Sequence, residues 1–359
     1  MPVFSKFLSL PLLAQENIFR LMHITDLFFF SQTSKRAEKL VNAARPKVHC
    51  LLSLRDEEMV ITLLSTERPD KERFSWRFSM SISLLELFEQ GKAIINGKEF
   101  EFWFNHDRNK EIFTYCQDFC GAINMIFHHY QYLFNIKNYL QVKMEDKFET
   151  DIPAVLKELN LTVTTDVAID TNEPVTEKEW NQLVDNLKFM RLLVSASITY
   201  PIDFSKISFT KYLVLQDSGA FTGEHLLQIT PIEYVQLMKV IPFDPIYLKR
   251  YVQNWLERTD NGFMALEIEL KDDYKWEGPE ESFSDLKTFE YDPKRRPERF
   301  KFKRQCKHCK CVRCTGESTE DCKNGRDVVR SDGRIATIIL KPDYFLMVAW
   351  EQRYRQAFC

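Results

Sequence analysis

The chain has 359 residues, of which 44% are hydrophobic and 13% aromatic, and its formal net charge is -3. This length predicts two to three domains of roughly 150 residues with a sizeable core, and the aromatic content excludes a disordered chain. The small net charge predicts no general attraction to nucleic acid or membranes, and neither glycine-rich phosphate-binding motif occurs. No apolar run approaches the roughly 20 residues that span a bilayer, so we expect a soluble protein.

The first forty residues predict three short helices. Pro11 suits the first turn of a helix over 11–22, because that turn does not use the N–H that proline lacks. Thr25 is the expected N-cap of a second helix ending near Ser31, and Ser34 is the expected N-cap of a third. Such short helices cannot bury all their leucines and phenylalanines against one another, so we expect the remaining apolar surface to bind a partner.

The order of motifs in residues 4–44 resembles an F-box. It reads L-x-L-P-L-L, I-F-x-x-M, L-F-F-F-S-x-x-S-K-R and L-V, and the S-K-R-x-x-x-L-V helix is similar to the version in a large nematode family of F-box proteins. The resemblance implies that this segment docks on the Skp adaptor, and through it on the cullin, of an SCF ubiquitin ligase, while the rest presents a protein substrate. Matched position by position, the implied adaptor contacts are Leu10, Pro11, Ile18, Leu21, Met22 and Leu27. Any one of them is equally a candidate for a helical core, and it is the ordered pattern that favours the F-box.

Residues 45–140 predict a β meander followed by a helix. Two apolar runs and the alternating stretch FSWRFSMSIS predict strands, and Asn96-Gly97 predicts a tight hairpin turn. LLELFEQG predicts a helix that ends at Gly91, and residues 111–137 predict one amphipathic helix or two.

Strands alternate with helices over 141–272, which predicts a parallel sheet with right-handed crossovers. Thr176, with Glu179 three residues later, predicts a capping box, and Thr222 opens a further helix. A spacing of about 25 residues indicates a leucine-rich-repeat-like half-solenoid, although the asparagine-bearing consensus is missing. Residues 326–351 predict a two-stranded ribbon.

These two segments are similar to the type-2 F-box-associated region of the same nematode family. The likeness lies in K-Y-L-V-L-Q-D-S, in Y-L-K-R-Y-V-Q-N-W-L and, in the tail, in D-V-V-R-S-D-G-R-I-A-T-I. It implies a substrate-binding module. The expected fold class is therefore α+β with an α/β part: a three-helix F-box (4–44), a β-rich segment with a helix (45–140), and a leucine-rich-repeat-like α/β region (141–272 and 326–351).

Residues 273–325 depart from that pattern as an insertion that begins acidic and becomes basic. From Lys294 to Arg313 it holds ten Lys or Arg against one Glu, and its cysteines form two C-x-x-C pairs. The expected ligands of one tetrahedral zinc ion are Cys306, Cys309, Cys314 and Cys322, with Cys311 or His308 as substitutes. Only one residue separates the two pairs, so a cysteine-rich loop without metal is the alternative.

The sequence offers no catalytic constellation: it has no nucleophile elbow, no H-E-x-x-H and no kinase signature. We expect a non-catalytic, intracellular adaptor, cytoplasmic or nuclear. The nine cysteines are an odd count and five of them crowd between Cys306 and Cys322, which suits reduced thiols or metal better than secreted disulfides. Two hypotheses remain beside it. One is a zinc-dependent nucleic-acid-binding protein that uses residues 294–322; the other is an F-box protein for which the adaptor is only a stabilising partner.

Overall fold

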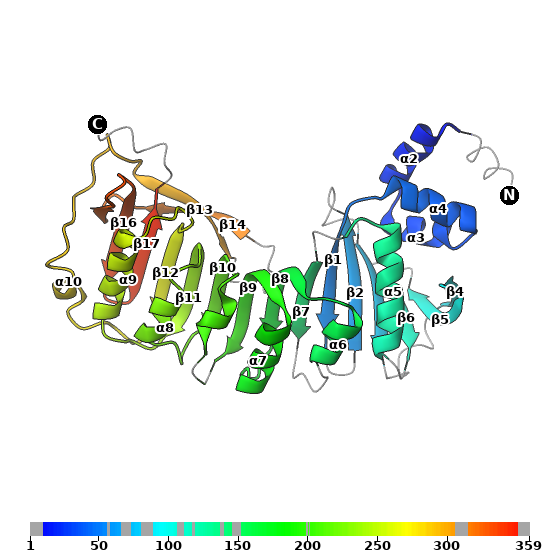
Figure 1. Ribbon diagram of the computed structural model, residues 1–359, viewed down its shortest axis with the longest axis horizontal. Helices are drawn as coiled ribbons and strands as arrows, with labels where there is room; N and C mark the ends of the chain where they lie inside the picture. Colours follow the sequence, from blue (N-terminus) through cyan, green and yellow to red (C-terminus); the bar gives the residue numbers. More distant parts are fainter. Residues whose placement is uncertain are drawn as a thin grey trace. The chain divides into compact units, whose positions relative to one another are not determined.

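The computed structural model describes residues 10–55, 58–65, 73–79, 89–105, 111–116, 119–136, 140–145, 152–198, 200, 202–305 and 315–350. The chain folds as two compact units, residues 1–165 and 166–359 (Figure 1). No helix among the described residues is long and apolar enough to cross a membrane.

The first unit begins with three helices and continues as a sheet that carries two more. Its elements are α2 (Leu12–Leu21), α3 (Ile24–Ser31), α4 (Lys35–Ala44), β1 (Val48–Leu54), β2 (Glu58–Ser65), β3 (Arg73–Ser79), β4 (Glu89–Ile95), β5 (Lys98–Asn105), β6 (Glu111–Tyr115), α5 (Phe119–Leu133), β7 (Leu140–Glu145) and α6 (Ile152–Glu158). The strand order is β7-β1-β2-β3-β6-β5-β4. β1 runs parallel to β7 and β3 runs parallel to β6, and the other pairs are antiparallel.

The three N-terminal helices form as expected, with one different cap. The Ser34 hydroxyl accepts a hydrogen bond from the Ala37 N–H at 3.1 Å, which confirms the cap of α4. The cap of α3 is His23 instead of Thr25, because the chain is already helical at Ile24 and the His23 Nδ1 accepts from the Thr25 N–H at 3.2 Å.

Two predictions for the β-rich segment are wrong and one is confirmed. Residues 111–115 form β6 instead of a helix, because they pair with β3 on one side and β5 on the other. Residues 84–88 of the predicted helix lie outside the described residues, but its expected end, Gly91, lies within β4. An added Cβ at Gly91 would fall 2.5 Å from the Phe102 ring, so close packing explains the glycine and a helix end does not. Asn96 and Gly97 have φ of 51° and 80° and make the expected hairpin turn between β4 and β5.

The second unit is built on parallel strands. Its elements, with β8 crossing the boundary, are β8 (Val163–Asp170), α7 (Glu177–Asn186), β9 (Lys188–Ser197), η2 (Phe204–Ile207), β10 (Tyr212–Asp217), α8 (Gly223–Gln228), β11 (Tyr234–Val240), α9 (Ile246–Glu257), β12 (Ala265–Leu270), α10 (Pro279–Ser282), β13 (Arg299–Gln305), β14 (Thr315–Asp321), β15 (Arg326–Val329), β16 (Ile335–Lys341) and β17 (Tyr344–Ala349). β9, β10, β11 and β12 are parallel neighbours, as the alternating pattern predicts. Antiparallel β17, β16 and β15 then extend the sheet from β12. Helices α8 and α9 lie in front of these strands in Figure 1.

Capping boxes open two of the helices in this unit. The Thr176 hydroxyl accepts from the Glu179 N–H at 3.3 Å, and the Glu179 carboxylate accepts from the Thr176 N–H at 2.7 Å. At α8 the ring of His225 takes the place of glutamate and accepts from the Thr222 N–H at 3.0 Å. Both helix starts therefore lie where the sequence predicts them.

Four buried or half-buried aromatic side chains, one after each of the strands β9 to β12, form a continuous line that we name the aromatic row. Its members are Phe204, Phe221, Phe243 and Trp276, and successive ring centroids lie 5.5, 6.5 and 6.2 Å apart. Such contacts stabilise beyond the area that they bury, so the row holds the four connections in fixed positions.

A few described residues of the segment 273–325 pack into the core of this unit. Phe300 of β13 packs edge-to-face on Trp350 at 5.0 Å, and Cys322 is 0% exposed beside them. The Arg296 side chain is likewise 0% exposed and pairs with Asp327 at 2.8 Å. Part of what reads as an insertion in the sequence therefore provides core contacts.

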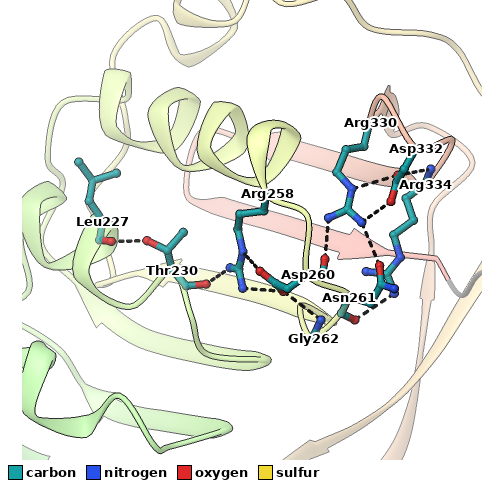
Figure 2. A network of polar contacts seen from close by, with 9 residues as sticks. All are labelled: Leu227, Thr230, Arg258, Asp260, Asn261, Gly262, Arg330, Asp332 and Arg334. Atoms are coloured by element: carbon teal, nitrogen blue, oxygen red, sulfur yellow. Dashed lines mark hydrogen bonds and ion pairs between the residues drawn. The ribbon is translucent and has the colours of Figure 1, made fainter.

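A network of arginines fastens the connection between α9 and β12 to the turn between β15 and β16 (Figure 2). Arg330 donates to the carbonyl of Asp260 at 2.8 Å and to the side-chain oxygen of Asn261 at 3.0 Å, and Arg334 donates to the carbonyl of Asn261 at 2.9 Å. Arg258 pairs with the Asp260 carboxylate. The charges at this edge of the unit are therefore largely paired with one another.

Candidate functional site

Exposed apolar side chains concentrate on α2 and the residue pair before it. Of eleven large hydrophobic residues that are exposed in the described part of the chain, four lie between residues 10 and 21. They are Leu10 (39% exposed), Leu13 (69%), Ile18 (36%) and Leu21 (71%). A cluster of this kind on one helix marks a binding surface, whereas single exposed apolar residues do not.

The helix has one face for the protein and one for a partner. At 3.6 residues per turn, Leu13, Ile18 and Leu21 fall within an arc of about 140°. Gln15 and Phe19 project from the other side and are 5% and 1% exposed. We name the exposed residues Leu10, Leu13, Ile18 and Leu21 the α2 face.

Hydrogen bonds and one ring contact hold α2 in place. The Gln15 Nε2 donates to the Leu10 carbonyl at 2.6 Å, which ties the residue before Pro11 to the helix. The Pro11 carbonyl accepts from the Ala14 and Gln15 N–H groups, and the Phe19 ring packs against the Phe30 ring at 5.3 Å. The inner side of the helix is therefore fixed while the α2 face stays open.

Helix α3 anchors the helical region to the sheet of the first unit. Phe28 is 0% exposed, and its ring lies 5.3 Å from Phe74, 5.4 Å from Trp76 and 5.9 Å from Tyr130. Phe29 packs edge-to-face on Phe104 at 5.3 Å. The phenylalanine run thus faces the protein's own core and does not contribute to the open face.

Polar contacts join the same helices to α5. The Gln32 side-chain amide lies 3.2 Å from the His129 Nε2, and the Asn42 Nδ2 donates to the Tyr132 carbonyl. Because an amide nitrogen only donates, the His129 Nε2 accepts and the ring proton sits on Nδ1, 3.9 Å from the Glu38 carboxylate. Burial lowers the pKa of His129 to about 4, and Glu38 offsets this only in part.

The stability of the first unit should therefore depend on pH through His129. Its pKa is lower in the folded protein than the ordinary 6.5, so the unfolded chain binds more protons between these values. The contribution is fully present above pH 6.5 and is lost as the pH falls toward 4, an effect of roughly 3 kcal/mol. We expect urea unfolding of His129→Gln to lose this slope and His128→Gln, at the exposed neighbour, to keep it. Equal slopes in both variants would contradict the assignment.

The structure places the six predicted adaptor contacts in different environments. Leu10, Pro11, Ile18 and Leu21 are exposed and Met22 is half-buried. Leu27 is 1% exposed because it points into the packing of α3, so it is a core residue and cannot reach a partner. Leu13 was not among the predicted contacts, although it is 69% exposed and lies on the same helical arc as Leu21.

Only one of the four predicted zinc ligands lies among the described residues, so the zinc site stays a prediction. Cys306, Cys309 and Cys314 lie outside the described residues. Cys322 is in the apolar core, 3.7 Å from the Glu320 carbonyl, and burial raises the pKa of its thiol to about 11. A zinc ligand must be a thiolate, and the apolar surroundings of Cys322 oppose the loss of its proton. No group of three metal-binding side chains occurs within the described ranges.

Comparison with known proteins identifies the segment that carries the α2 face. Residues 7–49 match the F-box domain family, a span that ends five residues beyond the predicted 4–44. No curated protein and no solved structure matches the chain. F-box domains bind the Skp adaptor within SCF complexes, and proteins that carry them are typically non-catalytic adaptors. The open face of α2 therefore lies within an F-box domain at residues 7–49 of this chain.

Proposed function

We propose that this chain is a substrate adaptor of an SCF ubiquitin ligase. It docks on the Skp adaptor through the α2 face and presents a protein target to the ligase. The observation that carries the proposal is the cluster of exposed leucines inside the F-box match. The chain contributes tethering and no chemistry: a target held near the charged enzyme gains a high effective concentration.

The contact residues that we propose are those that reach solvent. They are Leu10, Pro11, Leu13, Ile18, Leu21 and Met22. Leu13 and Leu21 have the largest exposed fractions, and each gains about 25 cal/mol for every Å² of apolar area removed from water. The opposite side of α2 is already packed against the protein. The helix therefore does not have to become ordered when a partner binds, which lowers the entropy cost of binding.

We assign the target-binding role to the second unit. In this proposal the unit is a type-2 F-box-associated region of the nematode kind, and its strands and helices have a leucine-rich-repeat-like arrangement. The parallel strands β9 to β12, alternating with helices, support this assignment. A role with the cullin-based ligase implies an intracellular location, cytoplasmic or nuclear.

Co-purification of the full chain with the Skp adaptor tests the proposal. We expect Leu21→Lys to weaken the complex by about 2 kcal/mol or more, roughly thirtyfold, since a charge replaces the most exposed leucine of the α2 face. The fold should tolerate the change, because Leu21 is 71% exposed and a lysine in the last turn suits the helix dipole.

Ile94→Lys is the matched control, because Ile94 is 67% exposed in the same unit and lies opposite Glu99 in the hairpin. It should bind like the unchanged chain. Equal binding by all three proteins would refute docking through α2. Adaptor binding without cullin would identify the adaptor as a stabilising partner only.

A further inference from the structure

The connections after the parallel strands build one edge of the second unit. Because β9 to β12 are parallel and adjacent, the segments that follow them lie side by side, and their described residues are 198, 200, 202–203, 218–222, 241–245 and 271–278. The Ser218 N–H donates to the Met238 carbonyl at 3.0 Å and the Lys271 N–H donates to the Val240 carbonyl at 2.9 Å, which fastens the starts of two segments to β11, the strand between them. Carboxyl ends of parallel strands are the usual place for binding in such sheets.

Three members of the aromatic row, Phe221, Phe243 and Trp276, lie within these segments, and Phe204 directly follows the first segment. Phe221 is 5% exposed and Trp276 is 4% exposed, and their rings connect through Phe243. Each segment is thereby held by its neighbours, so this edge is organised before any partner arrives.

Each segment contributes one half-buried or exposed apolar or aromatic residue to this edge, and we name these four residues the edge stripe. They are Tyr200, Ala220, Ile241 and Tyr274. Ile241 is 44% exposed and Tyr274 is 43% exposed, while Tyr200 and Ala220 are half-buried and line a hollow of about 10 Å³ that has apolar walls. The hollow is too small for a cofactor-sized ligand, and the stripe suits the side chains of a protein partner.

The edge at the carboxyl ends of the parallel strands differs in charge from the edge at their amino ends. The four segments, with Asp217 and Lys239 at their starts, carry six carboxylates and three lysines, a net charge of -3. Among the described residues, the carboxylates of Asp217, Asp272, Asp273 and Glu277 have no side-chain partner and are open to a ligand. At the other end of the strands, Lys211 pairs with Glu233 at 2.9 Å and Arg258 pairs with Asp260. Unpaired carboxylates attract a basic partner and repel nucleic acid.

The spacing of the edge stripe favours a helix as the bound element. Neighbouring strands lie about 4.8 Å apart, so the stripe advances by that distance from one segment to the next. A helix repeats an apolar face about every 5.4 Å, whereas same-side residues of a strand are about 6.7 Å apart. The repeat of a bound helix that crosses the segments therefore matches their spacing more closely than the repeat of a bound strand does.

We propose that this edge binds a short, basic, amphipathic helix of the presented protein target. Its apolar side chains contact the edge stripe, and its lysines or arginines pair with the open carboxylates around it. The biological role of this contact rests on the proposed adaptor function, but the binding itself does not require the Skp adaptor.

Selection from a phage-displayed library of helical peptides of roughly 16 residues, about four turns, tests the proposal. The bait is the full chain. We expect the selected peptides to be basic, with apolar residues three or four positions apart. Their affinity should fall about tenfold in the variant Ile241→Ser/Tyr274→Ser and should weaken as salt is added. Phe209→Ser, at a 63% exposed residue before β10, is the control that should keep full affinity.

Three results would overturn the proposal: no selected peptides, a selection of neutral or acidic peptides, or an equal loss in the Phe209→Ser control. Co-purification with the Skp adaptor on the same preparations separates the two proposals. Peptide binding without adaptor binding removes the ligase role and leaves the edge as a binding site. Adaptor binding without peptide binding removes the binding site at this edge and leaves the ligase role.

Discussion

Replacement of Arg296 by alanine is expected to lower the free energy of unfolding of the second unit by about 3–5 kcal/mol, the usual cost of leaving a buried charge without its partner. The Arg296 Nε donates to both carboxylate oxygens of Asp327 at 2.8 and 2.9 Å, and one terminal nitrogen donates to the Cys322 carbonyl at 2.8 Å. The guanidinium also lies 4.7 Å from the Tyr291 ring and 5.2 Å from the Trp350 ring. Its removal strands a carboxylate that is 3% exposed.

The partners of Asp327 extend the effect into the sheet. The Thr337 hydroxyl donates to Asp327 at 2.7 Å, and the Trp350 indole N–H donates to the same hydroxyl at 2.8 Å. A change at Arg296 therefore disturbs β15, β16 and the residue after β17 together. Hydrogen exchange read by mass spectrometry should show lost protection in these strands and unchanged protection in the first unit.

Arg326→Ala is the matched control, one residue before Asp327. Arg326 also faces a carboxylate, Glu290 at 3.0 Å, but the two side chains are 59% and 84% exposed. Exposed pairs contribute about 0–1 kcal/mol because water screens them and the side chains lose freedom. A loss at Arg296 no larger than at Arg326 would show that the buried pair is unimportant for stability.

Replacement of Phe28 by alanine is expected to destabilise the first unit by about 3–5 kcal/mol, as is usual for a buried phenylalanine. Its ring is 0% exposed and contacts Phe74, Trp76 and Tyr130, so truncation leaves a cavity between α3 and the sheet. The Gln32–His129 contact lies one turn further along the same helix and should open with it. Chemical denaturation followed by circular dichroism measures the loss.

Tyr132→Ala provides the comparison within the same unit, because that side chain is 43% exposed and should cost within about 0.5 kcal/mol. Phe28→Ala and Leu21→Lys should also separate stability from docking. The first lowers stability, whereas the second lowers adaptor binding in a folded protein. Equal stability of Phe28→Ala and Tyr132→Ala would mean that the F-box helices do not depend on the sheet.

The features that sequence reasoning predicted correctly are those that depend on near neighbours in the chain. The cap at Ser34, the box of Thr176 with Glu179 and the turn at Asn96-Gly97 each involve contacts within a few residues. Helix boundaries and the alternation of strands with helices follow from such local signals. The F-box pattern is of the same kind, since its order is readable along one short segment.

The features that it missed depend on residues far away in the chain. Residues 111–115 are rich in side chains that suit either helix or strand, and they are a strand because β3 and β5 offer hydrogen bonds on both sides. Leu27 and Leu13 are the same residue type on neighbouring helices, and only the packing of α3 against the sheet buries one and leaves the other open. Arg296 and Cys322 read as parts of a polar, cysteine-rich insertion, yet they meet Asp327 and Trp350 in a core. Burial is a property of the assembled chain, because it depends on which distant surfaces meet, and no short stretch of sequence specifies that.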